Sequence, residues 1–116
     1  MPVALQYERS RLTAVLSGEI DHHNAAFLRE QIDQAICKLH PPALRLDFGA
    51  VTFMDSSAVG LVMGRYKAMA GGGALEVTNL SPAACKMMRM ANLQSLARLR
   101  CQELTPDEKE EEAVLV

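Results

Sequence analysis

The pattern of apolar and polar residues predicts strands and helices in regular alternation along the chain. Val3 to Tyr7 and Leu12 to Leu16 read as two strands around a polar turn, which is typical of a β-hairpin. Between Ala25 and Leu39, apolar residues recur at steps of three and four, the spacing of a helix with one buried face. His40 and the two prolines after it are expected to end this helix, because proline disfavours helical geometry in the residue before it.

The alternation continues through the second half of the chain. Ala43 to Asp47 has the length and apolar content of a short strand. The next helix is predicted to begin near Asp55, to end at Gly71-Gly72-Gly73, and to bury a face made of Val59, Val62, Met63, Tyr66, Met69 and Ala70. The remaining predicted elements are a strand over Ala74 to Asn79, a helix from Ser81-Pro82 to about Ala91, an edge strand within Leu96 to Cys101, and a last helix from Thr105 through Val116.

This order predicts a single α/β domain over residues 1–116, with a mixed, mostly parallel sheet of four to five strands covered by about four helices. Strands separated by helices favour parallel pairing, and the first hairpin adds an antiparallel edge. In open sheets of this kind, functional sites lie beyond the carboxyl ends of the strands. The loop of Asp55 to Ser57 follows a strand in this way, and Asp21 to Asn24 shares that end of the sheet if the two strands are parallel.

The residues Asp55, Ser56 and Ser57 stand where a buried run gives way to a helix. Asp55 is predicted to be the N-cap residue, which places both serines in the first turn. The N–H groups of a first turn have no intrahelical partner, and the helix dipole favours negative charge there. A serine in this turn could hold a phosphate, although on these three residues alone a plain helix cap is the commoner explanation.

The second loop contains Asp21, for which two interpretations stay open: a cap for the first helix, or a part of a docking surface. The adjacent His22 and His23 do not predict a metal site, because neighbouring side chains in a helix or strand do not converge on one ion and no set of further ligands accompanies them. Both histidines are expected to face solvent or an interface.

Composition and charge exclude several classes of protein. The net charge of −2 gives no electrostatic footprint for nucleic acid or an anionic membrane. No apolar run approaches the ~20 residues that span a bilayer, and the N-terminus lacks the features of a signal peptide. The three cysteines, Cys37, Cys85 and Cys101, show no close pairing, so we expect reduced thiols that fill apolar space in a cytoplasmic protein.

Three segments taken together resemble the STAS domains of bacterial anti-sigma-factor antagonists. They are Gly18-Glu19-Ile20-Asp21-His22-His23, then Phe53 through Leu61 with Gly64-Arg65-Tyr66-Lys67, and finally Leu80-Ser81-Pro82-Ala83. The likeness covers nearly the whole chain in order and length. Ala58 departs from the glycine that the family has after the two serines, and Asn92 stands where glycine is common. Ala58 is expected to stiffen the first turn and to leave less room for a partner's backbone.

The resemblance implies a protein–protein switch that is not an enzyme and needs no cofactor. In the family, the unmodified antagonist binds an anti-sigma factor that is also a serine kinase, and this binding frees a sigma factor. The kinase then phosphorylates the second serine of the pair, which matches Ser57, and the modified protein dissociates until a phosphatase restores it. The expected chain is monomeric when free and binds its partner through Asp21, His22, His23, Asp55, Ser56, Ser57, Ala58 and Gly60.

Two other functions remain open. The chain could be a scaffold subunit of a larger STAS assembly, such as a stress-signalling complex. It could also be a small serine hydrolase that uses Ser56 or Ser57 with His22 or His23. The G-x-S-x-G elbow of many such hydrolases is missing, which argues against the second alternative.

Overall fold

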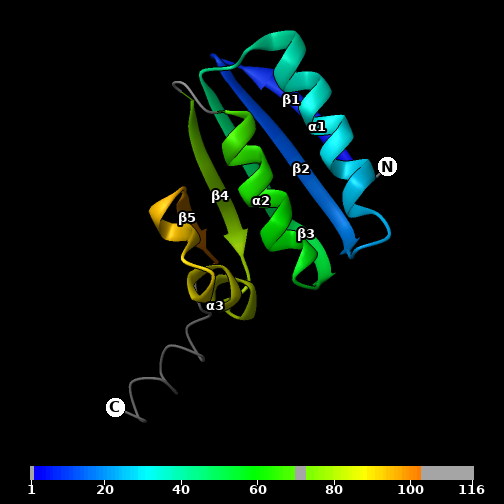
Figure 1. The fold of residues 1–116 in the computed structure, drawn as a ribbon, viewed down its shortest axis with the longest axis vertical. Coiled ribbons are helices and arrows are strands. Elements are labelled where there is room, and N and C mark those ends of the chain that lie inside the picture. The colour runs from blue at the N-terminus through cyan, green and yellow to red at the C-terminus, as the bar shows by residue number, and fades with distance from the viewer. Residues whose placement is uncertain (1, 70–72, 103–116) are drawn as a thin grey trace.

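The computed structural model, which describes residues 2–69 and 73–102, contains a five-stranded mixed sheet (Figure 1). The strands are β1 (Val3–Glu8), β2 (Arg11–Ile20), β3 (Ala43–Met54), β4 (Ala74–Leu80) and β5 (Arg98–Cys101). They lie in the sheet in the same order as in the chain. β1 pairs with β2 in antiparallel fashion and all later pairs are parallel, which confirms the predicted sheet.

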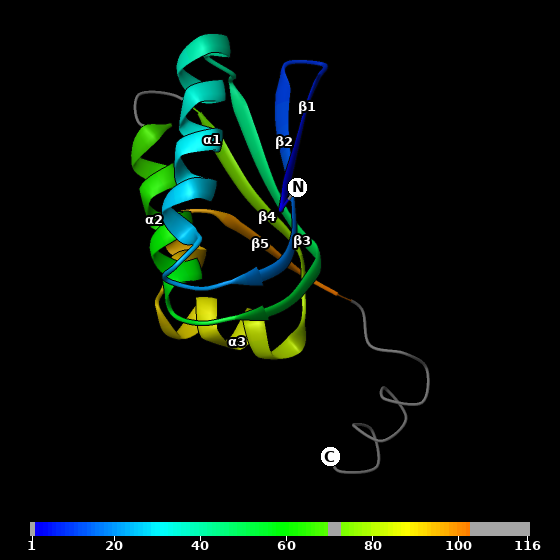
Figure 2. The same ribbon diagram turned by 90° about the vertical axis from the view of Figure 1, so that its right-hand side faces the viewer.

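The helices in the described residues are α1 (Ala25–Leu39), α2 (Ser57–Ala68), α3 (Pro82–Met90) and a short 3-10 turn over Leu93–Ser95. Figure 2 shows α1 and α2 side by side on one face of the sheet, with α3 at the end where β4 finishes. The helix predicted from Thr105 lies outside the described residues, so three α-helices stand where about four were expected. None of the helices in residues 2–69 and 73–102 is long and apolar enough to cross a bilayer.

The predicted end of α1 and the predicted start of α3 are confirmed by their local chemistry. His40 ends α1 in a left-handed conformation with φ of 46°, directly before the two prolines. Ser81 caps α3, because its hydroxyl oxygen accepts a hydrogen bond of 3.2 Å from the Ala84 N–H. Asn92 has a φ of 62°, which is the left-handed region that glycine adopts most easily. This conformation explains why glycine is common at that position in the family.

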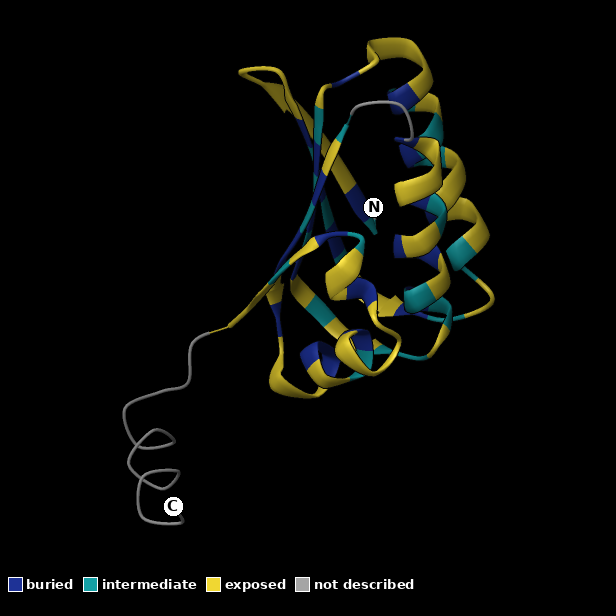
Figure 3. Ribbon diagram, turned by 60° about the vertical axis from the view of Figure 1, so that its left-hand side comes forward, coloured by how far each residue is buried: buried dark blue, intermediate teal, exposed yellow. Residues whose placement is uncertain are grey.

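The core lies between the sheet and its helices (Figure 3). Alternate residues of the central strands point toward α1 and α2, as the period of a strand requires. The buried set includes Leu12, Ala14 and Leu16 of β2, Leu44, Leu46 and Phe48 of β3, Val77 of β4, and Leu28, Ile32 and Ile36 of α1. The buried face of α1 is therefore the one that its apolar spacing predicts.

The buried face of α2 differs from the prediction by one residue along the helix. Ala58, Leu61, Val62 and Arg65 are buried, whereas Met63 and Tyr66 are 39% and 41% exposed. Both sets have helical spacing, so periodicity alone does not separate them. Val62 and Met69 are buried and Val59 is partly buried, as predicted, so the prediction is wrong for Met63 and Tyr66 and missed Ala58, Leu61 and the buried Arg65. The helix also ends at Ala68, before the predicted glycine stop.

Two strands are longer than predicted, and their extra residues carry the site. β3 continues past Asp47 to Met54, and β2 continues past Leu16 to Ile20. Irregularities between Val15 and Ser17 and between Gly18 and Glu19 interrupt the pairing without ending it. Because Ile20 pairs with Met54, the two strands finish level with each other. Ser17, Gly18 and Glu19 hid the extension of β2 from a reading of apolar runs, whereas the extension of β3 is mostly apolar and is interrupted only by Gly49 and Thr52.

The cysteines do not behave as expected. Cys85 of α3 and Cys101 of β5 form a disulfide with a Cα–Cα distance of 5.8 Å, and Cys37 is exposed. The expectation of reduced thiols is therefore wrong for Cys85 and Cys101, and the expectation that the cysteines fill apolar space is confirmed for Cys85 alone of the three. The crossover from α3 to β5 brings together two residues that are 16 positions apart, a pairing that sequence spacing cannot reveal.

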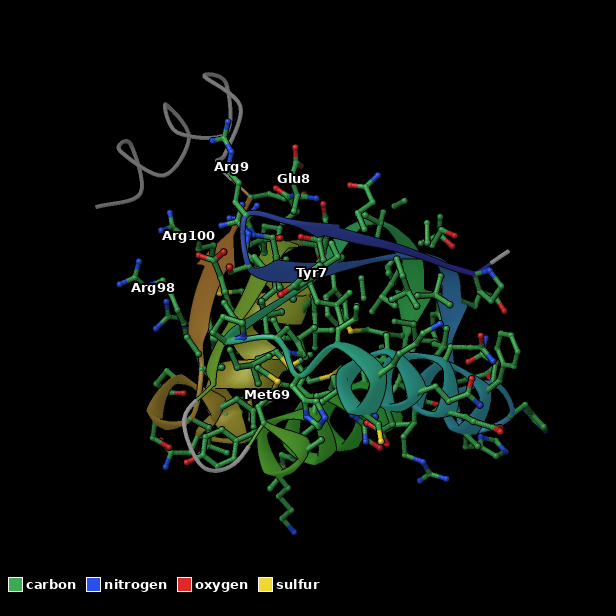
Figure 4. All side chains as sticks on the ribbon, turned by 90° about the horizontal axis from the view of Figure 1, so that it is seen from above. Tyr7, Glu8, Arg9, Met69, Arg98 and Arg100 are labelled. Carbon is green, nitrogen blue, oxygen red and sulfur yellow. A yellow bond between two sulfur atoms is a disulfide. The ribbon has the colours of Figure 1, made fainter. Side chains whose placement is uncertain are left out.

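The sheet face opposite α1 and α2 carries charged residues on β3, β4 and β5. One carboxylate oxygen of Glu76 accepts a hydrogen bond of 2.7 Å from Arg45 Nε–H, and the other accepts one of 2.6 Å from Arg100 Nε–H. Burial raises the pKa of Glu76, but the hydrogen bonds from Arg45 and Arg100 outweigh it, so the pKa lies below its ordinary value. Figure 4 shows Arg98 and Arg100 projecting outward from β5. This ion-pair network links β3, β4 and β5 away from the carboxyl ends of β2 and β3.

Candidate functional site

Two turns lie together at the carboxyl ends of β2 and β3. The first spans Asp21–Asn24 and leads into α1, and the second spans Asp55–Ser56 and leads into α2. The Asp55 N–H donates a hydrogen bond of 3.1 Å to the Ile20 carbonyl, so the backbones of the two turns are joined directly. The parallel pairing of β2 and β3 thus confirms that both loops share one end of the sheet.

The second turn is organised by the carboxylate of Asp55. Its Oδ1 accepts hydrogen bonds from the Ser57 backbone N–H at 2.8 Å and from the Ser57 hydroxyl at 2.5 Å. The helix begins at Ser57 and Ser56 occupies the N-cap position, one residue later than predicted, with no side-chain cap bond from Ser56. Asp55 nevertheless satisfies one of the first N–H groups of the helix, which is the work of a capping side chain.

The charge state of Asp55 follows from these contacts. The hydroxyl of Ser57, then its backbone N–H and more weakly the nearby His22, lower the pKa of Asp55 below its ordinary value, against a smaller opposing effect of desolvation. Asp55 is therefore a carboxylate at neutral pH and can only accept hydrogen bonds. The Ser57 hydroxyl must be the donor, which fixes the direction of its proton and leaves its oxygen lone pairs for other partners.

The first turn is organised by Asp21, but not as the cap of α1. Asp21 Oδ1 accepts hydrogen bonds from the His23 N–H at 2.9 Å and the Asn24 N–H at 3.1 Å. The N-cap position belongs to Asn24, whose side chain accepts from the Asp21 N–H at 3.0 Å and donates to the Glu19 carbonyl at 2.5 Å. The interpretation of Asp21 as the cap residue is corrected: Asp21 shapes the turn that precedes the cap.

The two histidines are exposed and each faces a carboxylate. Their side chains are 76% and 77% exposed, and their ring centroids are 4.0 Å apart. His22 Nδ1 is 3.9 Å from Asp55 Oδ2, and His23 Nδ1 is 3.8 Å from Asp21 Oδ1. The histidines therefore form the outer rim of the two turns, in agreement with the expectation that they face solvent or an interface.

The predicted partner-binding residues gather at this end of the sheet, with one exception. Ser56 and Gly60 are exposed and Ser57 is half-buried. Ala58 has no exposed surface and its methyl group packs in the core. The expectation that Ala58 narrows the space for a partner's backbone is therefore wrong, because the residue faces the interior. Gly60 and Gly64 have open space where a Cβ would be, so neither is needed for close packing within this chain.

A groove of about 350 Å³ runs between the starts of α1 and α2. Its lining residues are His22, Ala25, Ala26, Arg29, Ser57, Gly60 and Leu61. Arg29 was not among the site residues predicted from the sequence, yet it lines the groove together with Ser57. The available signal was its spacing: Arg29 lies one helical turn after Ala25 and Ala26, so it shares their side of α1.

An ion pair between the buried Arg65 of α2 and the half-exposed Asp33 of α1 holds the two helices together. Arg65 is 3% exposed; its Nη2 donates to Asp33 Oδ2 at 3.1 Å and its Nε lies 2.8 Å from Asp33 Oδ1. Burial lowers the pKa of Arg65, Asp33 opposes this effect, and the neighbouring Arg29 adds to it. The pair ties together the two helices that begin at the two turns, so it helps to set the position of one turn relative to the other.

The site does not have the arrangement of a serine hydrolase. Such an enzyme needs a histidine that accepts the serine proton and an aspartate that orients the histidine. Here the Ser57 hydroxyl donates to Asp55 itself, and within the described residues no histidine bonds to Ser57. A carboxylate with a lowered pKa is a weak base. The hydrolase alternative therefore finds no support in this geometry.

The fold and the paired turns define the class of the protein. A family model for the STAS domain matches residues 3–110. The chain therefore belongs to the STAS domain family. Two curated relatives that it resembles carry the same functional name. The chain is 33% identical over 94 residues to the anti-sigma F factor antagonist of Paenibacillus polymyxa, a match that covers 80% of each chain. It is 34% identical over 86 residues to that of Lysinibacillus sphaericus, covering 73% of this chain and 74% of the relative.

Solved structures agree with the family. The anti-sigma factor antagonist SpoIIAA in its unphosphorylated form is 27% identical, with a TM-score of 0.71 and coverage of 98% of this chain and 97% of that one. The phosphorylated form of the Bacillus cell fate determinant SpoIIAA is 28% identical, with a TM-score of 0.66 and coverage of 96% and 98%. These structures are similar to the chain over nearly its full length.

Proposed function

We propose that the chain is an anti-sigma factor antagonist that works as a phosphorylation switch in the cytoplasm. The unphosphorylated form binds an anti-sigma factor with serine kinase activity and so releases a sigma factor. Phosphorylation of Ser57 by that kinase ends the binding, and a serine phosphatase restores it. The chain itself is a substrate of both enzymes and catalyses neither step, and it is monomeric when free.

The observation that carries this proposal is the Ser57 hydroxyl, which lies at the start of α2 and donates to an ionised Asp55. The hydroxyl is half-buried on a rim that also holds the exposed His22, His23 and Ser56. Such a rim can contact a partner in the same docking event that brings the kinase to Ser57. The relatives named as anti-sigma F factor antagonists, and the SpoIIAA structure in a phosphorylated form, support the same function.

The switch has a local physical basis. A phosphoryl group adds about −1.5 to −2 charges and removes the hydroxyl proton that Ser57 donates to Asp55. The new dianion then lies beside an existing carboxylate, at a surface shaped for a neutral hydroxyl. Desolvating that charge in an interface is costly, and a loss of only ~2.7 kcal/mol weakens binding about a hundredfold. No change of fold is required.

The direct test mixes the purified chain with an anti-sigma factor kinase from the same organism and ATP, and maps the phosphate by mass spectrometry. We expect the label on Ser57 in the wild type and in Ser56→Ala, which serves as the matched control. Ser57→Ala should bind the kinase as the wild type does and take up no label. A label on another residue would overturn the proposal, as would equal binding of the bare and phosphorylated forms.

The local character of the switch is tested separately by amide NMR spectra of the two forms. Shifts should be confined to the two turns and the first turns of α1 and α2. Widespread shifts in β4, α3 or β5 would contradict a local mechanism even if Ser57 is the modified residue.

A further inference from the structure

We propose that Arg29 is a phosphoryl-binding residue, which holds the modified Ser57 side chain in the groove between α1 and α2. This inference rests on the proposed phosphorylation of Ser57. The groove is lined by Ser57 and Gly60 from α2 and by Ala25, Ala26 and Arg29 from α1. Small side chains on both walls leave room for a phosphoryl group, and Arg29 provides a charged wall on the side opposite Ser57.

The charge of this region is unbalanced before modification. Within the described residues, Arg29 forms no ion pair with a carboxylate. The neighbouring Arg65 uses the one carboxylate at hand, that of Asp33, and Arg29 acts on Arg65 as a like charge. Asp33 thus pairs with Arg65 and leaves the neighbouring Arg29 without an ion-pair partner among the described residues. A phosphoryl group on Ser57 would supply the missing negative charge to the cation that has no partner.

The direction that the phosphoryl group takes follows from its neighbours. Ser57 loses the proton that it donates to Asp55, so a bond of 2.5 Å between them becomes a repulsion between two anions. Asp55 is not part of the groove wall, whereas His22 and Arg29 are. Turning into the groove therefore takes the phosphoryl oxygens away from the carboxylate and toward Arg29, with the exposed His22 at the mouth.

Arginine suits this role because its planar guanidinium can give two parallel hydrogen bonds to a phosphate. Holding the phosphoryl group has two consequences. The modified form gains stability from the new contact, and its phosphoryl oxygens become less accessible to an attacking phosphatase. Arg29 thereby acts on the lifetime of the switched-off state and not on the fold.

The test uses the full chain with phosphoserine incorporated at position 57 during synthesis, so it does not depend on the kinase. Wild type, Arg29→Gln and Lys38→Gln are compared; Lys38 lies at the far end of the same helix and matches the loss of one charge. The 31P chemical shift is followed against pH. The phosphate should titrate at a pH about half a unit lower in wild type and Lys38→Gln than in Arg29→Gln, about a threefold difference in proton affinity.

Two further readouts separate a specific contact from a general structural effect. The Arg29 Nε–H signal should shift on phosphorylation, and an unselective alkaline phosphatase should remove the phosphate several-fold faster from Arg29→Gln than from Lys38→Gln. Identical 31P titrations for Arg29→Gln and wild type would overturn the inference while leaving the proposed function intact. If instead the kinase labels another residue, the proposed function fails whatever the phosphoserine chain shows.

Discussion

The turn after β2 and the turn after β3 lie side by side at one end of the sheet, and each is organised by an aspartate. Asp21 uses one carboxylate oxygen to accept two backbone N–H groups, from His23 and Asn24. Asp55 also uses one carboxylate oxygen twice, but one of its two donors is the hydroxyl of Ser57. The two turns thus share a design and differ in a single donor.

That difference determines which turn can respond to a chemical signal. A backbone N–H cannot be phosphorylated, so a kinase cannot modify the groups that the Asp21 carboxylate accepts. The hydroxyl of Ser57 can be modified, and modification removes the proton on which its bond to Asp55 depends. The first turn is therefore a fixed element of the surface, and the second is a variable one held beside it by the Arg65–Asp33 pair.

The largest expected effect comes from breaking the pair that holds the two turns in position. Asp33→Ala leaves the guanidinium of Arg65 buried without a carboxylate, and we expect a loss of about 3 kcal/mol in the free energy of unfolding, measured with urea. Arg65→Met should cost clearly less, because Asp33 is 40% exposed and can be hydrated. Glu30→Ala on the same helix is the control. Equal losses for Asp33→Ala and Arg65→Met would show that the burial of Arg65 is unimportant.

Reduction of the Cys85–Cys101 disulfide tests whether the structure of the two turns depends on α3 and β5. The bond closes a loop of 16 residues, and opening it should lower the free energy of unfolding by ~3 kcal/mol. The amide signals of both turns should stay unchanged, since neither contacts α3 through an ion pair or hydrogen bond within residues 2–69 and 73–102. Cys37→Ser, at an exposed position, should change neither quantity. A shift of the amide signals of the turns on reduction would show that the two turns depend on the disulfide.

The contrast between the aspartates themselves is tested by exchanging each for asparagine. Asp55→Asn weakens the acceptor of the Ser57 hydroxyl, so the rate of phosphorylation by the anti-sigma kinase should fall roughly tenfold. Asp21→Asn retains a side-chain oxygen for the two N–H groups and should change that rate less than twofold. Initial rates of phosphate incorporation measure both. The contrast fails if the two variants slow the reaction equally.

The smallest effect is the pH dependence of the second turn. The pKa of Asp55 is lowered in the folded chain, so its stabilising contribution is complete above the unfolded value of about 3.9 and is lost as the pH falls through the lowered folded value. Ser57→Ala removes the largest cause of the lowering, and the pKa of Asp55 should rise toward its ordinary value. Carboxyl 13C titration of the wild type and Ser57→Ala measures the change. An unchanged pKa in Ser57→Ala would mean that the hydroxyl bond has no effect on Asp55.

Much of the architecture was predictable because hydrophobic period and helix-ending residues act locally. The buried face of α1, its end at His40, and the Ser81 cap of α3 all follow from neighbouring residues. The sequence predicted that β2 and β3 finish at the same end of the sheet only if the two strands are parallel, and it did not establish that they are. Which face of α2 is buried was not predictable from local spacing, since the buried Arg65 bonds to Asp33, 32 residues away in the chain.

The site was foreseen in its residues more than in its contacts. Both loops and the closeness of Asp55 to the start of α2 were predictable from the sequence, but the contacts of the neighbouring side chains depend on tertiary packing. Asn24 rather than Asp21 holds the N-cap position, Ala58 faces the core, and Arg29 reaches the groove beside Ser57. The disulfide was missed for the same reason, because α3 and β5 meet only in the folded chain.

The order of the strands has a consequence for the way the chain is made. Each strand pairs with the one that precedes it in the chain, so every strand leaving the ribosome meets a partner that has already emerged. This order allows the sheet to grow from the β1–β2 hairpin by one parallel strand at a time. The bond between Cys85 and Cys101 can form only when β5 has joined the edge, which makes it a chemical mark of a finished sheet.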